Sequence, residues 1–242
     1  MVAGEARVME IDDERIAQAI AETEILRFPK QTLATFGITN IYYYLVTKPS
    51  YSELVGETQE TVVREGRVIT ERPRVVTPFY LLNLEGFSEH ASRFLETVRR
   101  EYGPHAPGLF YTYRNERGEL TIVADDLPAV VDRLSAKIDK EGDPLCTIIK
   151  GVDELWDVSL LKFIYDFIEG SLRSNVWDLS TRGLLDIDSS GVPRDARYRV
   201  EELFEQVRKG EIDPAELKRE LDRWNMFREY EDRFLSLFRR RG

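Results

Sequence analysis

Apolar residues recur at helical spacing in two segments of the N-terminal part of the chain. Between residues 87 and 102 they lie three and four positions apart, and the pattern ends at Gly103-Pro104. A second stripe runs over residues 127–138 and is followed by Gly142. Such spacing places side chains on one side of a helix, and glycine and proline end helices. We therefore predict a helix over each segment.

Strand signals come before and between these helices. The run NIYYYLVT at 40–47 is rich in β-branched and aromatic residues, as strands are. The segments 60–71 and 108–123 each contain two β-rich runs around turn-forming residues, which are Glu65-Gly66 in the first and residues 115–118 in the second. This arrangement predicts one strand and two hairpins.

Two other segments are assigned from the residues that begin, end or interrupt them. Asp12 and Asp13 precede a helical pattern that ends near Phe28-Pro29, and proline disfavours helical backbone in the residue before it. The run RVVTPFYLLNL at 74–84 is strand-like and is interrupted by Pro78. We predict a helix for the first segment and a broken strand for the second.

From residue 150 onward no strand signal remains. The run at 152–168, VDELWDVSLLKFIYDFI, is apolar around most of its circumference, as expected for a helix buried between others. Three further apolar stripes follow at 200–207, 217–224 and 227–238. Asp213-Pro214 is a typical helix start, with a capping residue before proline. This half of the chain is therefore predicted to be helical.

These elements predict an α+β protein. An N-terminal antiparallel sheet with flanking helices occupies residues 1–148, and an all-helical C-terminal subdomain at 149–242 packs on it. Hairpins favour antiparallel pairing, and a run of strands followed by helices is typical of this class. No Gly/Ser-rich linker separates the two parts, so the boundary is soft.

Composition and charge narrow the classes of function. The chain is 42% hydrophobic and 32% charged, with a formal net charge of −10. Because nucleic-acid binding depends on neutralising phosphates with cations, an acidic chain makes nucleic acid an unlikely partner. Cys146 is the only cysteine, the N-terminus carries no signal-like apolar run, and no apolar segment is free of charges. We expect a cytoplasmic protein that does not enter a membrane.

The stretch LLDIDSSGVPRD at 184–195 resembles the opening of a calcium loop. Asp186, Asp188 and Ser190 stand where ligands 1, 3 and 5 would be. Pro193 occupies position 8, and position 12 carries Arg197 instead of a bidentate glutamate. These three residues are therefore weak metal candidates. We interpret the stretch as a turn that Ser189 or Ser190 caps, with Pro193 and Asp195 in the first turn of the next helix.

A cluster of three carboxylate residues at the start of the 152–168 segment has two interpretations. Asp153, Glu154 and Asp157 lie three and four residues apart, a spacing that could hold a hard cation or support acid–base chemistry. Negative charge in the first turn of a helix also offsets the helix dipole. The second interpretation is preferred, because carboxylates at the start of a helix are common.

Aromatic and basic residues suggest a binding groove. Tyr42 and Tyr44 share one face of the predicted strand at 40–47, where they could stack on a ligand or simply pack in the core. Arg72 and Arg74 follow the first predicted hairpin, and His105 lies in a loop, where functional residues concentrate. Together these five residues form a candidate site for a small anionic ligand.

No catalytic, nucleotide-binding or metal-binding motif is found in the sequence, and no cofactor is predicted. The favoured function is a non-enzymatic binding or scaffold protein that binds a protein partner or self-associates as a homodimer through its C-terminal helices. The alternative is a sensor or enzyme for a small anionic ligand, with a pocket between the sheet and the helices.

Overall fold

The computed structural model describes residues 13–52, 59–84 and 89–239. Contacts divide the chain into two compact units, and each unit is built from two separate stretches. Unit 1 comprises residues 1–72 and 111–175, and unit 2 comprises residues 73–110 and 176–242. Residues 73–110 thus group with the C-terminal helices. The sequence-based boundary near residue 148 stays a prediction.

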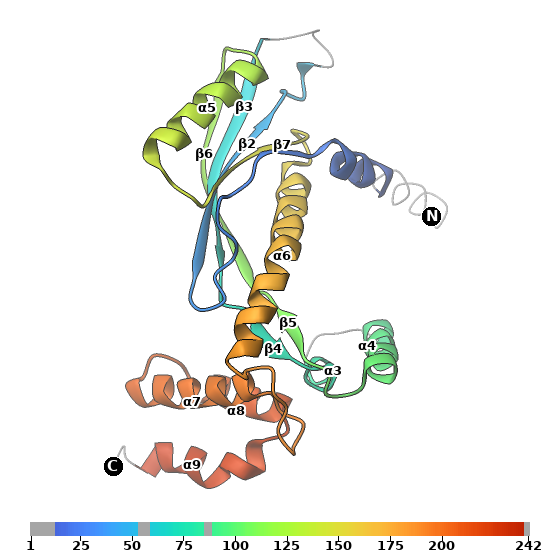
Figure 1. Ribbon diagram of the computed structural model, residues 1–242, viewed down its shortest axis with the longest axis vertical. Helices are drawn as coiled ribbons and strands as arrows, with labels where there is room; N and C mark the ends of the chain where they lie inside the picture. The colour runs from blue at the N-terminus through green and yellow to red at the C-terminus, as the bar shows by residue number, and fades with distance from the viewer. Residues whose placement is uncertain (1–12, 53–58, 85–88, 240–242) are drawn as a thin grey trace, which may run out of the picture. The chain divides into compact units, whose positions relative to one another are not determined.

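Unit 1 is built on a five-stranded sheet (Figure 1). Its strand order is β1 (Glu24–Arg27), β7 (Cys146–Lys150), β2 (Thr39–Thr47), β3 (Thr61–Thr70) and β6 (Tyr113–Val123). Neighbouring strands are antiparallel except β2 and β7, which are parallel. The α+β fold class is confirmed, and the sheet is mixed because β7 inserts between β1 and β2.

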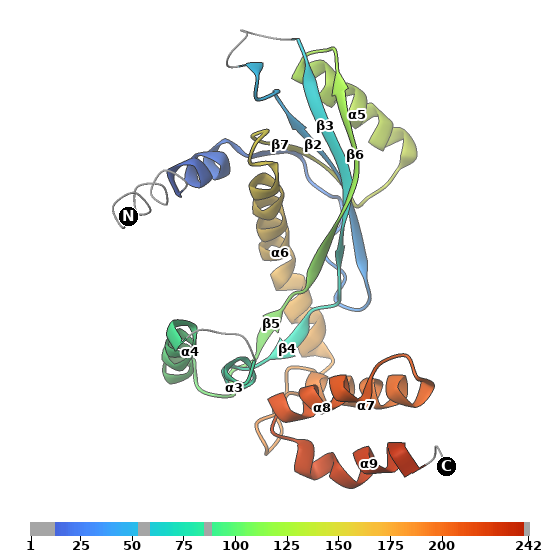
Figure 2. The same cartoon turned by 180° about the vertical axis from the view of Figure 1, so that it is seen from behind.

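Helices cover both faces of this sheet (Figures 1 and 2). Helix α5 (Leu127–Glu141) packs on one face and α6 (Trp156–Thr181) on the other, its residues up to Asn175 belonging to unit 1. Successive side chains of β2 point to opposite faces of the sheet and so contribute to the apolar cluster on each face. Tyr43 and Leu45 join the cluster with α6, whereas Tyr44 and Val46 join the cluster with α5.

The first predicted hairpin, at 60–71, is wrong. Residues 61–70 form the single strand β3, and Gly66 lies in its middle opposite Tyr43. The ring of Tyr43 occupies the space above Gly66, so that an added Cβ would lie 2.3 Å from Tyr43 Oη. Gly66 is therefore required for close packing across the sheet and does not form a turn.

The second predicted hairpin is wrong for a related reason. Residues 113–123 form one strand, β6, in which Asn115 Oδ1 accepts a hydrogen bond of 3.1 Å from Tyr43 Oη. The register shifts so that Gly118 and Glu119 lie opposite the single residue Glu65, as in a β-bulge. The turn-forming residues of this segment thus serve a cross-strand contact and a bulge.

Two strands were missed near the sheet's other edge. The N-terminal helical stretch covers residues 13–22 of the described chain and ends before Phe28, because β1 occupies residues 24–27; Asp12 lies outside the described residues. Strand β7 has four consecutive buried residues. A strand buried on both faces lacks the alternation by which strands are recognised.

Unit 2 contains a two-stranded sheet of β4 (Arg74–Val76) and β5 (Gly108–Phe110). In the sequence, α3 (Pro78–Leu82) and α4 (Glu89–Tyr102) lie between these two strands. The predicted broken strand at 74–84 is wrong beyond residue 76. The side-chain oxygen of Thr77 accepts a hydrogen bond from the Tyr80 N–H and caps α3, so Pro78 begins a helix. The helix predicted at 87–102 is confirmed as α4; Phe87 lies outside the described residues.

The C-terminal helices of unit 2 are α7 (Arg194–Lys209), α8 (Pro214–Arg223) and α9 (Phe227–Arg239), and their prediction is confirmed (Figure 2). Asp213 caps α8 as expected, its Oδ1 accepting a 2.7 Å hydrogen bond from the Ala215 N–H. Their apolar stripes meet in one core with β4 and α3. Within the described residues, none of the helices combines the length and apolar character that a membrane span requires.

Candidate functional site

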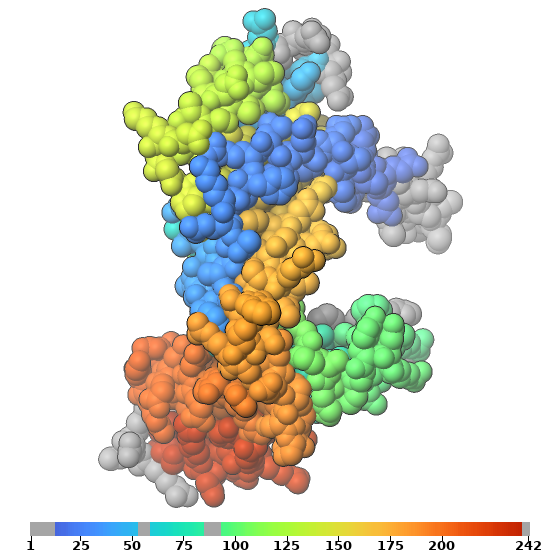
Figure 3. Space-filling view, in the orientation of Figure 1, coloured from blue at the N-terminus to red at the C-terminus, as the bar shows by residue number. Residues whose placement is uncertain are grey.

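Helix α6 leaves an apolar stripe exposed in unit 1. Leu161, Tyr165, Ile168 and Leu172 are spaced four, three and four residues apart, so they share one side of the helix. We call these four residues the α6 stripe. Leu161, Tyr165 and Leu172 are 50%, 67% and 42% exposed, and α6 forms part of the molecular surface seen in Figure 3. The sheet covers the adjacent side of the helix, which carries Leu160, Phe163, Ile164 and Phe167, and Ile168 lies half-buried at the border of that side.

Strand β6 carries exposed apolar residues on the same face of the sheet. Leu120 pairs with Arg64, which pairs with Leu45, and Leu45 packs in the cluster with α6. Directly opposed residues of antiparallel strands point to the same face. Leu120 is 58% exposed, and Ile122, two residues further along β6, is 52% exposed. The face of unit 1 that holds α6 therefore has apolar side chains on both the helix and the outermost strand.

The free edge of β6 is protected against pairing with another strand. The bulge at Gly118 and Glu119 interrupts the regular ladder in the middle of the strand. Charged residues at Arg114, Glu116 and Arg117 flank it. Bulges and charges are the usual devices that keep sheet edges from associating. The arrangement therefore favours contact through side chains of this face and opposes strand addition.

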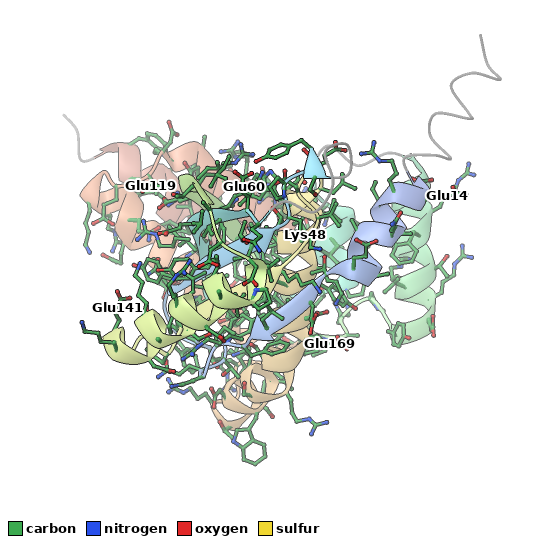
Figure 4. All side chains as sticks on the ribbon, turned by 90° about the horizontal axis from the view of Figure 1, so that it is seen from above. Glu14, Lys48, Glu60, Glu119, Glu141 and Glu169 are labelled. Carbon is green, nitrogen blue, oxygen red and sulfur yellow. The ribbon has the colours of Figure 1, made fainter. Side chains whose placement is uncertain are left out.

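Unit 1 also carries most of the negative charge. Assigning the charged residues of the sequence to the two units leaves unit 2 close to neutral, so the net charge of −10 falls almost entirely on unit 1. Glu119 on β6, Glu141 on α5 and Glu169 on α6 are exposed members of this set (Figure 4). A partner of unit 1 would gain from positive charge.

Of the predicted carboxylate group, only Asp157 lies in the first turn of α6, because Asp153 and Glu154 precede the helix, and Asp153 has a structural role. Asp153 Oδ1 lies 2.7 Å from Arg64 Nη1 and accepts a 2.9 Å hydrogen bond from Thr47 Oγ1, while its Oδ2 accepts one of 3.0 Å from the Ser50 N–H. Burial alone would raise the pKa of Asp153, but these hydrogen bonds outweigh it and lower that pKa. Glu154 forms an exposed ion pair with Arg15. The carboxylate of Asp153 is thus fully engaged.

Unit 2 contains a small polar cavity among β4, α3, α7 and α8. Its volume is about 10 Å³, and Arg74, Tyr80, Asp195, Arg199 and Glu220 supply its polar lining. The wall is completed by Val75, Val76, Ala196 and Trp224. Arg74 is thus the one residue of the predicted anion site that lines this cavity.

The carboxylates of the cavity already have partners. Glu220 Oε2 accepts a 3.0 Å hydrogen bond from Tyr80 Oη, and Glu220 Oε1 accepts one of 3.2 Å from Trp224 Nε1. Asp195 Oδ2 accepts a 3.1 Å hydrogen bond from the Val75 N–H. Burial, followed by the charge of Glu220, raises the pKa of Tyr80. The sequence analysis did not predict Glu220 or Arg199 as cavity residues. Each lies next to the apolar stripe of its helix, and this position was the only indication of burial.

The remaining residues of the predicted anion site are divided between the units. Tyr42 lies on β2, 44% exposed and opposite Arg67, while Tyr44 is only 8% exposed, with Lys137 Nζ 5.1 Å from its ring centroid. Arg72 is half-buried and makes contacts of its own. These three belong to unit 1, whereas Arg74 and His105 belong to unit 2. A shared ligand-binding role stays a prediction.

The loop that resembled a calcium site is closed by hydrogen bonds within the protein. Asp188 Oδ1 accepts from the N–H groups of Ser190 and Val192, and Asp188 Oδ2 lies 2.8 Å from Arg197 Nη2. Asp186 lies 3.3 Å from Arg194. The predicted serine cap of α7 is wrong: the N-cap is Pro193, and the Asp188 side chain satisfies the loop N–H groups instead.

His105 covers this same loop. A Cβ added at Gly191 would lie 2.2 Å from His105 Cε1, so the imidazole rests directly on the glycine backbone, and Gly191 has a φ of +81° that favours glycine. The Phe79 ring lies 6.3 Å away, centroid to centroid. His105 is itself exposed, contacts the Gly191 backbone, and is not among the residues that line the Arg74 cavity.

Within residues 13–52, 59–84 and 89–239, no group of three or more His, Cys, Asp or Glu side chains is arranged to hold a metal ion. Comparisons with models of protein families, with curated proteins and with solved structures found no match for this chain. A function for the chain must therefore be argued from its own surfaces and cavities.

Proposed function

We propose that this chain is a protein-binding module and that the α6 stripe of unit 1 is its binding surface. The observation that carries the proposal is the exposure of Leu161, Tyr165 and Leu172 on one side of a helix whose other side is buried in the sheet. Large apolar side chains gathered on one surface are typical of interaction sites. Residues at i, i+4, i+7 and i+11 suit contact with a second helix.

The size of the stripe favours a single helix as the partner. The exposed parts of its three most exposed side chains amount to roughly 300 Å². A stable protein–protein interface buries about 800 Å² on each partner, and a permanent dimer usually more. A single docked helix, with further contacts to Leu120 and Ile122, matches the available surface better than an extensive dimer interface does.

Charge selects among such helices. Because unit 1 holds nearly all of the net negative charge, a second copy would bring like charge to the surface, whereas a basic helix would bring opposite charge. The proposed partner is therefore a basic amphipathic helix of another protein. Self-association through the last three helices has less support, because α7, α8 and α9 direct most of their apolar side chains into one core.

The alternative, a sensor or enzyme for a small anionic ligand, has less support from the cavity that contains Arg74. A volume of about 10 Å³ is too small for an organic anion. Protein binding is the better-supported function.

Three synthetic peptides test the proposal. The Lys peptide has leucines at helical spacing and lysines elsewhere, the Glu peptide replaces the lysines with glutamates, and the scrambled peptide keeps the composition of the Lys peptide but scatters its leucines. Fluorescence anisotropy measures their affinities for the full chain. We expect the Lys peptide to bind at least about tenfold more tightly than either of the others, a difference of about 1.4 kcal/mol.

A matched pair of variants localises the binding. Tyr165→Glu should weaken Lys-peptide binding about tenfold or more, although the added negative charge alone would strengthen it. Tyr198→Glu on α7 makes the same change at a residue that is 54% exposed in unit 2, and should leave the affinity unchanged. Equal binding of the Lys and scrambled peptides would contradict the proposal. A dimer in light scattering that Tyr165→Glu dissociates would assign the stripe to a second copy instead.

A further inference from the structure

The Arg74 cavity of unit 2 collects two unpaired hydrogen-bond donors. The Nε atoms of Arg74 and Arg199 are the buried side-chain polar atoms that have no hydrogen-bond partner in the described part of the chain. Both arginines line the same cavity. A buried N–H without a partner costs about 1–3 kcal/mol, so two such groups at one cavity call for an acceptor inside it.

We infer that this cavity binds one ordered water molecule, which accepts hydrogen bonds from Arg74 and Arg199. Its volume of about 10 Å³ is just large enough for one water, which needs about 10–15 Å³ and two to four polar partners. The two Nε–H groups supply two partners. The oxygens of Asp195 and Glu220 retain lone pairs that can accept the protons of the water.

A small anion is the rival occupant, and both size and charge count against it. Chloride is larger than water, whereas the cavity volume lies at the lower limit for a water molecule. Two carboxylates, Asp195 and Glu220, also line the wall and would repel an anion. Water avoids this repulsion because it can donate to the carboxylates as well as accept from the arginines.

The water would join three elements that come from distant parts of the sequence. Arg74 belongs to β4 and Arg199 to α7, and Glu220 on α8 is held by Tyr80 and Trp224. A shared water therefore couples the two arginines energetically, although their side chains, which carry only donors, cannot hydrogen-bond to each other. This inference does not depend on the proposed protein-binding function, because it concerns unit 2 alone.

A high-resolution crystal structure of the full chain tests the occupant directly. We expect an electron-density peak within hydrogen-bonding distance of both Nε atoms. Soaking with bromide should give no anomalous peak in the cavity. A bromide peak there would show an anion site and overturn the inference, as would a well-ordered cavity without density.

Thermal unfolding gives a second test in solution. Arg74→Met and Arg199→Met each remove a guanidinium, including its unpaired Nε–H, while keeping much of the side-chain length, and each should lower Tm by a few degrees. Because both donors serve one water, the double variant should lose less than the sum of the two single losses. Strict additivity would show that the arginines act independently and would refute the shared water. A Tm that rises on replacing fluoride with chloride at constant ionic strength would favour an anion instead.

Discussion

Helix α6 of unit 1 and the helices α7 to α9 of unit 2 treat similar apolar sequences in opposite ways. In unit 2 the stripes of three helices meet in one core, which buries Leu203, Phe204, Leu217 and Leu221 almost completely. In unit 1 the sheet covers only one side of α6 and leaves Leu161 and Tyr165 at least half exposed. The apolar content of a helix therefore limits how much surface it can bury. It does not determine how many neighbouring elements cover that surface.

The polar interiors of the two units differ in a similar way. In unit 1, Asp153 and Arg64 pair directly, and neither is among the described residues that have an unpaired buried side-chain polar atom. In unit 2, Arg74 and Arg199 face a cavity with two donors that lack protein partners. In unit 1, exposed apolar residues of α6 thus accompany a directly paired polar cluster. In unit 2, the core formed by α7, α8 and α9 adjoins a cavity with two unpaired donors.

The sharpest test of this contrast compares the same substitution in both units. Leu217→Ala removes a fully buried side chain from unit 2 and should lower the free energy of unfolding by about 2–5 kcal/mol. Leu161→Ala removes a half-exposed side chain from α6 and should change it by no more than about 0.5 kcal/mol. Urea unfolding measures both. A large loss for Leu161→Ala would show that the α6 stripe is covered by the protein itself.

The polar interior of unit 1 is tested by two adjacent carboxylates. Asp153→Asn leaves Arg64 without its charged partner and should cost about 3 kcal/mol, as for other largely buried pairs. Glu154→Gln breaks an exposed pair and should cost less than about 1 kcal/mol. Urea unfolding at neutral pH measures both losses, and equal losses would contradict the structural role given to Asp153.

The same aspartate predicts a pH dependence. Because folding lowers the pKa of Asp153, its stabilisation is complete above its ordinary pKa of about 3.9 and is lost as the pH falls through the lower pKa of the folded protein. Thermal unfolding between neutral pH and pH 3 should therefore show a steeper loss in the wild type than in Asp153→Asn. Parallel curves would show that this pair does not contribute to the acid sensitivity.

Glycine substitutions test the packing of the sheet in unit 1. Gly66→Ala would place a Cβ against the Tyr43 ring and should cost about 1–3 kcal/mol through overpacking. Gly170→Ala in α6 has no atom within 4 Å of the new Cβ and should stabilise the helix by about 0.5–1 kcal/mol. Opposite signs in thermal unfolding are expected. A neutral Gly66→Ala would mean that Tyr43 can move away without loss.

Modest effects are also expected in the 184–195 loop of unit 2. Asp188→Ala removes the acceptor for the Ser190 and Val192 N–H groups and the partner of Arg197, and should cost about 1–2 kcal/mol. Asp186→Ala should cost less than about 0.5 kcal/mol, because its pair with Arg194 is exposed. Added calcium should leave Tm unchanged. A calcium-dependent rise that Asp186→Ala abolishes would instead establish a metal site.

The fold class and most helices could be predicted because their signals are local. Stripes and caps such as Asp213 and Gly142 act within a few residues, and both appear where expected. The sheet was harder, because Gly66 and Asn115 serve contacts with Tyr43, which is distant in sequence. Gly66 and Asn115 therefore resemble turn residues in the sequence, although both lie within strands.

The candidate sites depend even more on long-range structure. The apolar circumference of α6 was visible in the sequence, but which side the sheet covers follows only from the packing of Leu160, Phe163 and Phe167. The charge of Arg74 and its place after a β-rich run are visible in the sequence. Its companions Arg199 and Glu220 come from two other helices, and sequence spacing alone does not bring them together.

The central claim is that unit 1 binds a basic amphipathic helix through the α6 stripe. Methyl-resolved NMR of the full chain titrated with the Lys peptide tests it most directly. We predict chemical-shift changes concentrated on the methyl groups of Leu161, Ile168 and Leu172, with smaller changes at Leu120 and Ile122. Leu235 on α9, which is 44% exposed in unit 2, should be unaffected. Changes centred on unit 2, or spread equally by the scrambled peptide, would contradict the account.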